Sequence, residues 1–190
     1  MIMSSASPSD SSAGTSEGRG RERFSVLFER LHDDVVLPSP ATAGSAGHDV
    51  RAYLKARTIR CSDGQSQNER AAALENDEWA IELAPGEMAL IPLGFRTRMP
   101  LGIEAQVRPR SGQAFKHALT IPNAPGTVDA DYAEEWMVIV RNDAPVARRI
   151  LHGERIAQVV FAEYADIVVI EGAVSRSSQR AGGFGSTGRT

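Results

Sequence analysis

The stretch Ile103-Glu104-Ala105-Gln106-Val107-Arg108 decides the fold, because apolar and polar residues alternate along it without a break. Side chains of a β-strand point alternately to its two faces, so this pattern predicts a strand with one buried face. Segments 79–83 and 136–140 also favour strands, whereas helical periodicity over ten or more residues is hard to find. Many short strands joined by Gly and Pro turns predict an all-β barrel or sandwich.

Other β signals lie on both sides of this strand. The stretch 88–99 is typical of two strands interrupted near Pro92 and Gly94, and order is expected to begin near Phe24 with a strand or a short helix. Further strands are expected at 49–54, 159–161 and 167–170. The polar stretch 57–78 predicts a surface insertion, within which 68–75 permits a helical turn.

The chain has 190 residues, of which 42% are hydrophobic, enough for one domain with a real core. We expect a disordered tail at 1–23, a β-domain at 24–175 and a flexible C-terminal arm at 176–190. A net charge of -3 disfavours binding to a nucleic-acid polymer. No apolar run approaches the ~20 residues of a membrane span, so a soluble, cytoplasmic protein is expected. Cys61 is the only cysteine, which excludes an intrachain disulfide.

The last nine residues, Gly182-Gly183-Phe184-Gly185-Ser186-Thr187-Gly188-Arg189-Thr190, combine glycines with phosphate-binding donors. Glycine lets backbone N–H groups turn towards an anion, and hydroxyl and guanidinium groups donate to phosphate oxygens. The aromatic face of Phe184 can cover a planar base. This composition predicts a flexible lid for a nucleotide polyphosphate, and a disordered Gly/Ser tail is the alternative.

Three polar segments lie at the ends of expected strands. Pro109-Arg110-Ser111-Gly112 can receive a phosphate, or simply end a strand as a turn. Asp129 and Asp131 precede a strand, where a carboxylate can activate water for phosphoanhydride hydrolysis or cap a turn. Arg155 can contact a ligand or form a structural ion pair.

The order of these segments resembles that of the five motifs of the trimeric dUTPase family, and the similarity spans about 24–190 outside the insertion. The matching stretches are Ala46-Gly47-His48-Asp49-Val50-Arg51-Ala52, Pro109-Arg110-Ser111-Gly112-Gln113-Ala114, Gly126-Thr127-Val128-Asp129-Ala130-Asp131-Tyr132, Gly153-Glu154-Arg155-Ile156-Ala157-Gln158 and 182–188.

The resemblance implies a jelly-roll-like β-barrel that forms a homotrimer, with each active site built from more than one subunit. It also implies hydrolysis of dUTP to dUMP and pyrophosphate, with Mg²⁺ bound to the triphosphate. By the same similarity Asp129 activates water, and Asp49 reaches the hydrated metal.

The resemblance assigns the remaining site residues as well. Asn123, with nearby backbone such as Gly126, would read the uracil edge, while Tyr132 would exclude a 2′-hydroxyl. The phosphates would be held by Arg110, Ser111, Gly112 and Gln158. In the arm, Phe184 and Gly185 would cover uracil, Ser186 and Thr187 would bind the terminal phosphates, and the γ-phosphate arginine would be Arg180, with Arg176 or Arg189 as substitutes.

Three positions depart from the family pattern. His48 stands where the family usually has Tyr, and Ala133-Glu134 replaces the common Arg-Gly. Arg180 also lies one residue closer to the paired glycines than is usual. A dCTP deaminase or bifunctional deaminase and dUTPase, which shares the family's fold, is a second hypothesis. A non-catalytic nucleotide-sensing protein, which the departures at 133–134 and 180 motivate, is a third.

Overall fold

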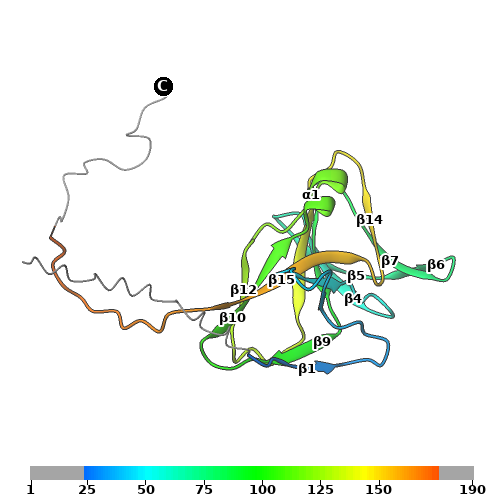
Figure 1. Ribbon diagram of the computed structural model, residues 1–190. Coiled ribbons are helices and arrows are strands. Elements are labelled where there is room, and N and C mark those ends of the chain that lie inside the picture. Colours follow the sequence, from blue (N-terminus) through cyan, green and yellow to red (C-terminus); the bar gives the residue numbers. More distant parts are fainter. Residues whose placement is uncertain (1–23, 176–190) are drawn as a thin grey trace, which may run out of the picture.

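The computed structural model describes residues 24–175, so the predictions for 1–23 and 176–190 lie outside the described residues. This part of the chain is almost entirely β-structure with one short helix (Figure 1). The strands are β1 (Leu27–Arg30), β2 (Ser39–Pro40), β3 (His48–Arg51), β4 (Thr58–Ser62), β5 (Gln67–Ala71), β6 (Ala73–Glu75), β7 (Glu78–Leu83), β8 (Met88–Pro92), β9 (Phe95–Arg98), β10 (Ile103–Pro109), β11 (Leu119–Thr120), β12 (Gly126–Val128), β13 (Met137–Asn142), β14 (Arg148–Leu151) and β15 (Arg155–Glu163).

Two five-stranded sheets form the body of the domain. One has the order β12-β10-β15-β3-β2 and the other β11-β13-β8-β4-β5. Smaller sheets, β1-β9 and β14-β7-β6, complete the arrangement. The prediction of an all-β fold is therefore confirmed.

β10 is an interior strand of the first sheet and follows its sequence pattern. Ile103, Ala105 and Val107 are buried, while Glu104 and Gln106 are half-buried on the opposite face. The strand pairs antiparallel with β12 on one side and with β15 on the other. The alternation of residue types thus fixes the register, because a shift by one residue would expose the apolar side chains.

An aromatic cluster joins the β1-β9 pair to the core. The ring centroid of Phe95 lies 5.5 Å from that of Phe28 and 5.4 Å from that of Trp136. Phe95 and Trp136 are each 1% exposed. Tilted aromatic pairs at this separation add to the stabilisation from burial itself.

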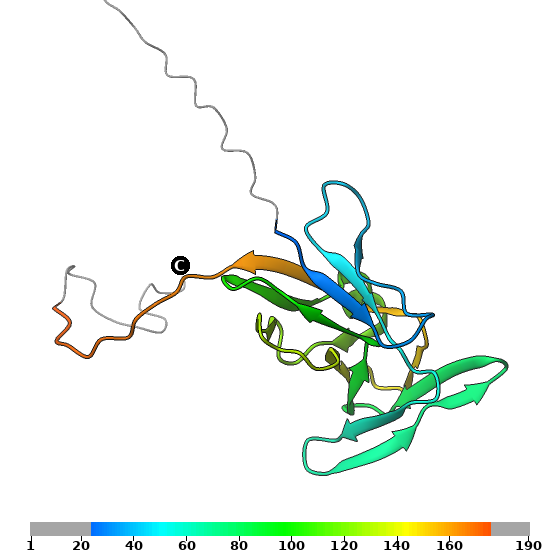
Figure 2. The ribbon, with the colours of Figure 1, turned by 90° about the horizontal axis from the view of Figure 1, so that it is seen from below.

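The insertion at 57–78 folds as strands, and the helical turn permitted at 68–75 is wrong. β5 pairs antiparallel with β4, and β6 pairs with β7. Figure 2 shows these two hairpins projecting from the rest of the domain. The local helical propensity of 68–75 is overridden because the neighbouring strands supply ladder hydrogen bonds to both halves of the segment.

The strand expected at 167–170 is also absent from the described residues. β15 ends at Glu163, and the chain then leaves the body as an extended segment (Figure 1). Ile167, Val168, Val169 and Ile170 are 74–88% exposed. Since a strand needs a neighbour for its hydrogen bonds, a β-type sequence without one is not assigned as a strand. No helix within residues 24–175 is long and apolar enough to cross a membrane.

Candidate functional site

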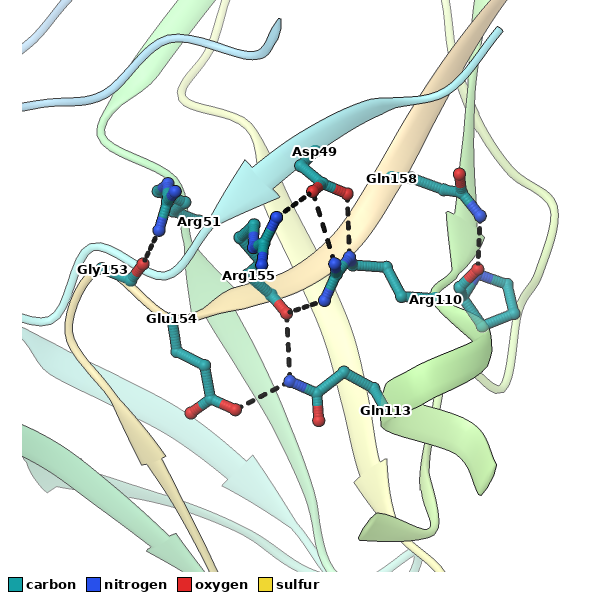
Figure 3. A network of polar contacts seen from close by, with 9 residues as sticks. Asp49, Arg51, Arg110, Gln113, Gly153, Glu154, Arg155 and Gln158 are labelled. Atoms are coloured by element: carbon teal, nitrogen blue, oxygen red, sulfur yellow. Dashed lines mark hydrogen bonds and ion pairs between the residues drawn. The ribbon is translucent and has the colours of Figure 1, made fainter. Parts of the chain in front are cut away.

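Asp49 on β3 gathers two arginines from distant parts of the chain (Figure 3). Its carboxylate accepts hydrogen bonds from Nε of Arg110 at 2.8 Å and from Nη1 of Arg155 at 3.1 Å. The Asp49 side chain is only 20% exposed. Two guanidinium groups therefore share one carboxylate, and their remaining N–H groups can donate to an anion.

The helix α1 (Ser111–His117) follows Arg110 directly and was not expected from the sequence. Gln113 is its only buried residue, and Nε2 of Gln113 donates to Oε1 of Glu154 at 2.7 Å and to the Arg155 carbonyl at 3.0 Å (Figure 3). Nη1 of Arg110 donates to the same carbonyl at 3.2 Å. The start of α1 is thus tied to the turn between β14 and β15.

Gln158 on β15 completes this group of side chains. Its Nε2 atom donates to the Pro109 carbonyl at 2.9 Å, just before Arg110. We call Asp49, Arg110, Gln113, Glu154, Arg155 and Gln158 the Asp49 cluster. The predicted phosphate residues Ser111 and Gly112 lie beside it and are exposed at the start of α1.

A cavity of about 450 Å³ lies beside β12, and we call it the hairpin pocket. Its lining includes the predicted site residues Asn123, Gly126, Asp129 and Tyr132. A Cβ atom on Gly126 would lie 2.9 Å from Nδ2 of Asn123, so the Asn123 amide packs directly against the backbone of Gly126. A cavity of this size can hold a nucleoside.

Asp129 is exposed at the pocket edge, and its carboxylate makes no hydrogen bond or ion pair within the described residues. Such a carboxylate is free to accept a hydrogen bond from water or from a ligand. Tyr132 is 42% exposed and its hydroxyl donates to the Glu135 carbonyl at 3.4 Å. The pocket thus combines an apolar floor with a few polar groups.

Within one chain the hairpin pocket and the Asp49 cluster are apart. Val128 of β12 pairs with Ala105 of β10, whereas Arg110 lies just beyond the other end of β10. Arg110 follows Ala105 by five residue steps, a span of about 17 Å at ~3.3 Å per residue. A single chain therefore brings Asp49, Arg110 and Gln158 together, and separately brings together Asn123, Gly126, Asp129 and Tyr132.

His152 in the β14–β15 turn is the titratable group of this region with a shifted pKa. Burial lowers the pKa of His152, and the positive charge of Lys55 lowers it further, while the charge of Asp34 acts in the opposite direction. Nδ1 of His152 accepts the Leu54 N–H at 3.0 Å, which requires this nitrogen to be unprotonated. The neutral imidazole thus fits its surroundings.

The dUTPase family model matches residues 77–188, and this stretch contains four of the five motifs. The chain belongs to the dUTPase family. A deoxyuridine 5′-triphosphate nucleotidohydrolase of Roseobacter denitrificans is 40% identical over 155 residues, covering 81% of this chain and 88% of the relative. One of Rhizobium etli is 46% identical over 153 residues, covering 80% and 85%.

Solved dUTPase structures share this fold. A mutant of the Staphylococcus phage 80alpha dUTPase with dUpNHpp has a TM-score of 0.64 and 21% identity, covering 86% of this chain and 98% of that chain. A mutant of the S. aureus phage phi11 dUTPase, described as coordinating a structural Mg(II) ion, has a TM-score of 0.62 and 17% identity, covering 80% and 99%. None of these comparisons favours the deaminase or the nucleotide sensor.

Sequence reasoning left two residues without a role. Gln113 was part of a matched motif, but its contact with Glu154 joins residues 41 positions apart. Glu135 follows the third motif and bonds to Gly94 and Arg57. The only local signal for Glu135 is an acidic residue in a polar stretch just before a strand. Sequence also left the role of Arg155 open, and the structure gives it an ion pair with Asp49.

Proposed function

We propose that this dUTPase-family protein hydrolyses dUTP to dUMP and pyrophosphate. The observation that carries the proposal is that one chain presents an arginine-rich cluster around Asp49 and an exposed carboxylate, Asp129, beside a cavity of nucleoside size. The reaction needs both halves, because it joins recognition of a nucleoside with attack on a polyphosphate. The matching relatives are named for this activity.

The hairpin pocket takes the deoxyuridine. Asn123 and the backbone near Gly126 pair with the uracil edge, which distinguishes uracil from cytosine by its donor and acceptor pattern. A mismatched buried polar group costs about 1–3 kcal/mol. The close fit of Asn123 against Gly126 supports a narrow slot that the methyl group of thymine would not enter. Tyr132 packs on the deoxyribose and rejects a 2′-hydroxyl.

Asp129 orients and deprotonates the water that attacks the α-phosphorus. The attack forms a P–O bond to water and breaks the bond between the α-phosphorus and the bridging oxygen, which leaves with pyrophosphate. The exposed, unbonded state of the Asp129 carboxylate among the described residues supports this role. A base must reach its water directly, and a carboxylate already held by an arginine would be a weaker base.

Arg110, Ser111, Gly112 and Gln158 hold the phosphates. The Asp49 carboxylate fixes the direction of the Arg110 guanidinium before substrate arrives, so less ordering is needed on binding. Arg155 adds a second guanidinium at the same carboxylate, with its side chain 48% exposed. This arrangement supports binding of a polyanion at the Asp49 cluster.

Mg²⁺ is the metal that fits this site when it arrives on the triphosphate. Within residues 24–175, no group of three or more His, Cys, Asp or Glu side chains could hold a metal ion. Single carboxylates such as Asp49 suit Mg²⁺, which keeps several waters and binds substrate phosphates. The ion would neutralise phosphate charge, and Asp49 would contact it through water.

The active protein is a homotrimer with shared active sites. The separation of about 17 Å between Ala105 and Arg110 along β10 supports a site completed by another copy, since Asp129 and Arg110 of one chain lie at opposite ends of that strand. The exposed apolar segment 167–170 also supports association, because such a surface gains from being covered.

The C-terminal arm closes the site. Its predicted contacts, made by Arg180 (or Arg176 or Arg189), Phe184, Gly185, Ser186 and Thr187, all lie outside the described residues. The glycine-rich sequence supports closure over the bound nucleotide, which would exclude water other than the nucleophile.

A nucleotide panel tests the function. The protein is incubated with Mg²⁺ and dUTP, dTTP, dCTP or UTP, and released pyrophosphate is measured. We expect rapid release from dUTP alone and no ammonia from dCTP. Equal release from dTTP or UTP would contradict the proposed pocket, and no release from dUTP would overturn the proposed activity.

A further inference from the structure

Glu135 is the polar anchor of the irregular segment 129–136, which links β12 to β13 and carries Asp129 and Tyr132. Ala130 and Trp136 are the buried residues of this segment. Within the described part of the chain, Glu135 makes the only side-chain hydrogen bonds from the segment to other elements, and Trp136 adds two backbone bonds. The position of the two site residues therefore depends strongly on Glu135.

The first contact of Glu135 is with the backbone of Gly94, in the turn between β8 and β9. Oε1 of Glu135 accepts the Gly94 N–H at 2.9 Å. Two backbone bonds flank this contact: Leu93 N–H donates to the Trp136 carbonyl at 3.0 Å, and Trp136 N–H donates to the Phe95 carbonyl at 2.9 Å. The Gly94 N–H lies between these two bonds and has no backbone acceptor within the described residues. The Glu135 carboxylate thus satisfies this donor.

Gly94 is a rigid point of attachment. Its φ is +75°, and a Cβ atom there would lie 2.6 Å from Cγ2 of Val35 and 2.9 Å from Cγ of Tyr53. Its carbonyl accepts the Leu31 N–H at 2.8 Å. Because the surroundings of Gly94 leave no room for movement, a side chain bonded to it is held in one place.

The second contact of Glu135 is an ion pair with Arg57, at the start of the insertion. The Glu135 and Arg57 side chains are only 13% and 24% exposed. Nη1 of Arg57 lies 3.3 Å from Nε2 of His32, whose ring stacks on Tyr53 with centroids 4.5 Å apart. A charge-assisted pair shielded from water in this way is more directional than a surface ion pair.

We propose that Glu135 is a positioning residue for the nucleoside half of the site. Because its side chain is hydrogen-bonded to both Gly94 and Arg57, Glu135 fixes the positions of Asp129 and Tyr132 at the edge of the hairpin pocket. The Tyr132 hydroxyl donates to the Glu135 carbonyl, so the tyrosine is coupled to the anchor directly. The inference rests on the proposed function, in which Tyr132 discriminates deoxyribose from ribose.

The test compares Glu135→Ala and Glu135→Gln in the full-length protein. The ratio of dissociation constants for a hydrolysis-resistant dUTP analogue and its ribonucleotide counterpart is measured by calorimetry with Mg²⁺. We expect Glu135→Ala to reduce the preference for the deoxy form by about tenfold. A change of this size corresponds to the loss of a hydrogen bond to a charged group. Glu135→Gln should restore only part of the preference, because its amide oxygen still accepts the Gly94 N–H while its amide nitrogen cannot accept from Arg57.

Glu75→Ala is the matched control, because Glu75 on β6 pairs with Arg149 and lies in the projecting hairpins. It should leave the preference unchanged. A ratio of two dissociation constants does not depend on the fraction of folded protein, so a loss of stability alone would not change it. An unchanged ratio in Glu135→Ala would overturn the proposal.

Arg57→Met replaces Glu135→Ala if the latter does not fold. It removes the ion pair and keeps the Gly94 bond, and we expect at least a threefold loss of preference. An unchanged ratio would then overturn the proposal. A wild-type protein that binds the deoxy analogue preferentially but releases no pyrophosphate from dUTP would contradict the proposed hydrolysis alone, since the Glu135 test measures binding.

Discussion

The Nε atom of Arg110 lies 2.8 Å from the Asp49 carboxylate, although 61 positions separate the two residues. Arg155 shares the same carboxylate from the strand between them in the sheet order, β15. One acidic side chain therefore organises two cations that come from separate motifs. If the cluster binds phosphates as proposed, this arrangement would give Asp49 a role in binding that does not depend on a metal.

We expect Asp49→Asn to weaken triphosphate binding even when EDTA removes the metal. The two guanidinium groups lose their anionic partner, and we predict about a tenfold higher dissociation constant for the dUTP analogue. Calorimetry with and without Mg²⁺ checks this. Asp143→Asn, which breaks an exposed pair with Arg141, is the control. Unchanged binding in EDTA would leave Asp49 with only its role through the metal.

Asp129→Asn should preserve the fold and nearly abolish turnover. The carboxylate is exposed and makes no hydrogen bond or ion pair among residues 24–175, so the free energy of unfolding of the protein should change by less than about 0.5 kcal/mol. Loss of a general base should lower kcat by about 10²–10⁴-fold. Asp131→Asn, two residues further on and also exposed, should lower kcat by less than about threefold. Near wild-type turnover in Asp129→Asn would remove it from the role of base.

The pH dependence of stability should include a contribution from His152. Its pKa is lowered in the folded protein, chiefly by burial, so the unfolded chain takes up a proton first as the pH falls. Stability from the neutral imidazole is therefore complete above an unfolded pKa of about 6.5 and is lost as the pH drops through the folded pKa. We measure the free energy of unfolding by denaturant between about pH 7 and pH 5. It should decline less in His152→Asn than in the wild type. The control His117→Asn, at an exposed position of α1, should show the wild-type decline.

Gly94 and Gly86 form a matched pair of positions at which to measure how an added side chain changes the free energy of unfolding. Both have positive φ, +75° and +78°, but nothing lies within 4 Å of a Cβ on Gly86. We expect Gly86→Ala to reduce the free energy of unfolding by about 1 kcal/mol, from backbone strain alone. Gly94→Ala should cost about 1–3 kcal/mol more, because the methyl group meets Val35 and Tyr53. Equal melting temperatures for the two variants would contradict this packing.

The sequence predicts the sheets better than the connections. The alternation in β10 predicts its buried face because strand geometry is periodic in two residues. α1 has seven residues, which is too short for a helical period to emerge, and a single buried side chain, Gln113, attaches it to the body. The segment 68–75 depends on pairing with β4 and β7, which no local propensity describes.

The same limit applies to the candidate site. The motifs identify Arg110, Asp129 and Gln158 because each stands in a recognisable local sequence. The residues that hold the site in place cannot be recognised from a local sequence, because contacts such as that of Glu135 with Arg57 join residues 78 positions apart. Tertiary contacts of this kind leave no periodic signal in one sequence.

The separation of Asp129 from Arg110 along β10 has a genetic consequence if the trimer forms as proposed. One kind of mutant subunit lacks only the Asp129 carboxylate, and another lacks only the Arg110 guanidinium. The two kinds are damaged in different halves of the shared active site. Mixed assemblies would contain some catalytic centres with neither lesion, so two dead alleles expressed together would complement each other.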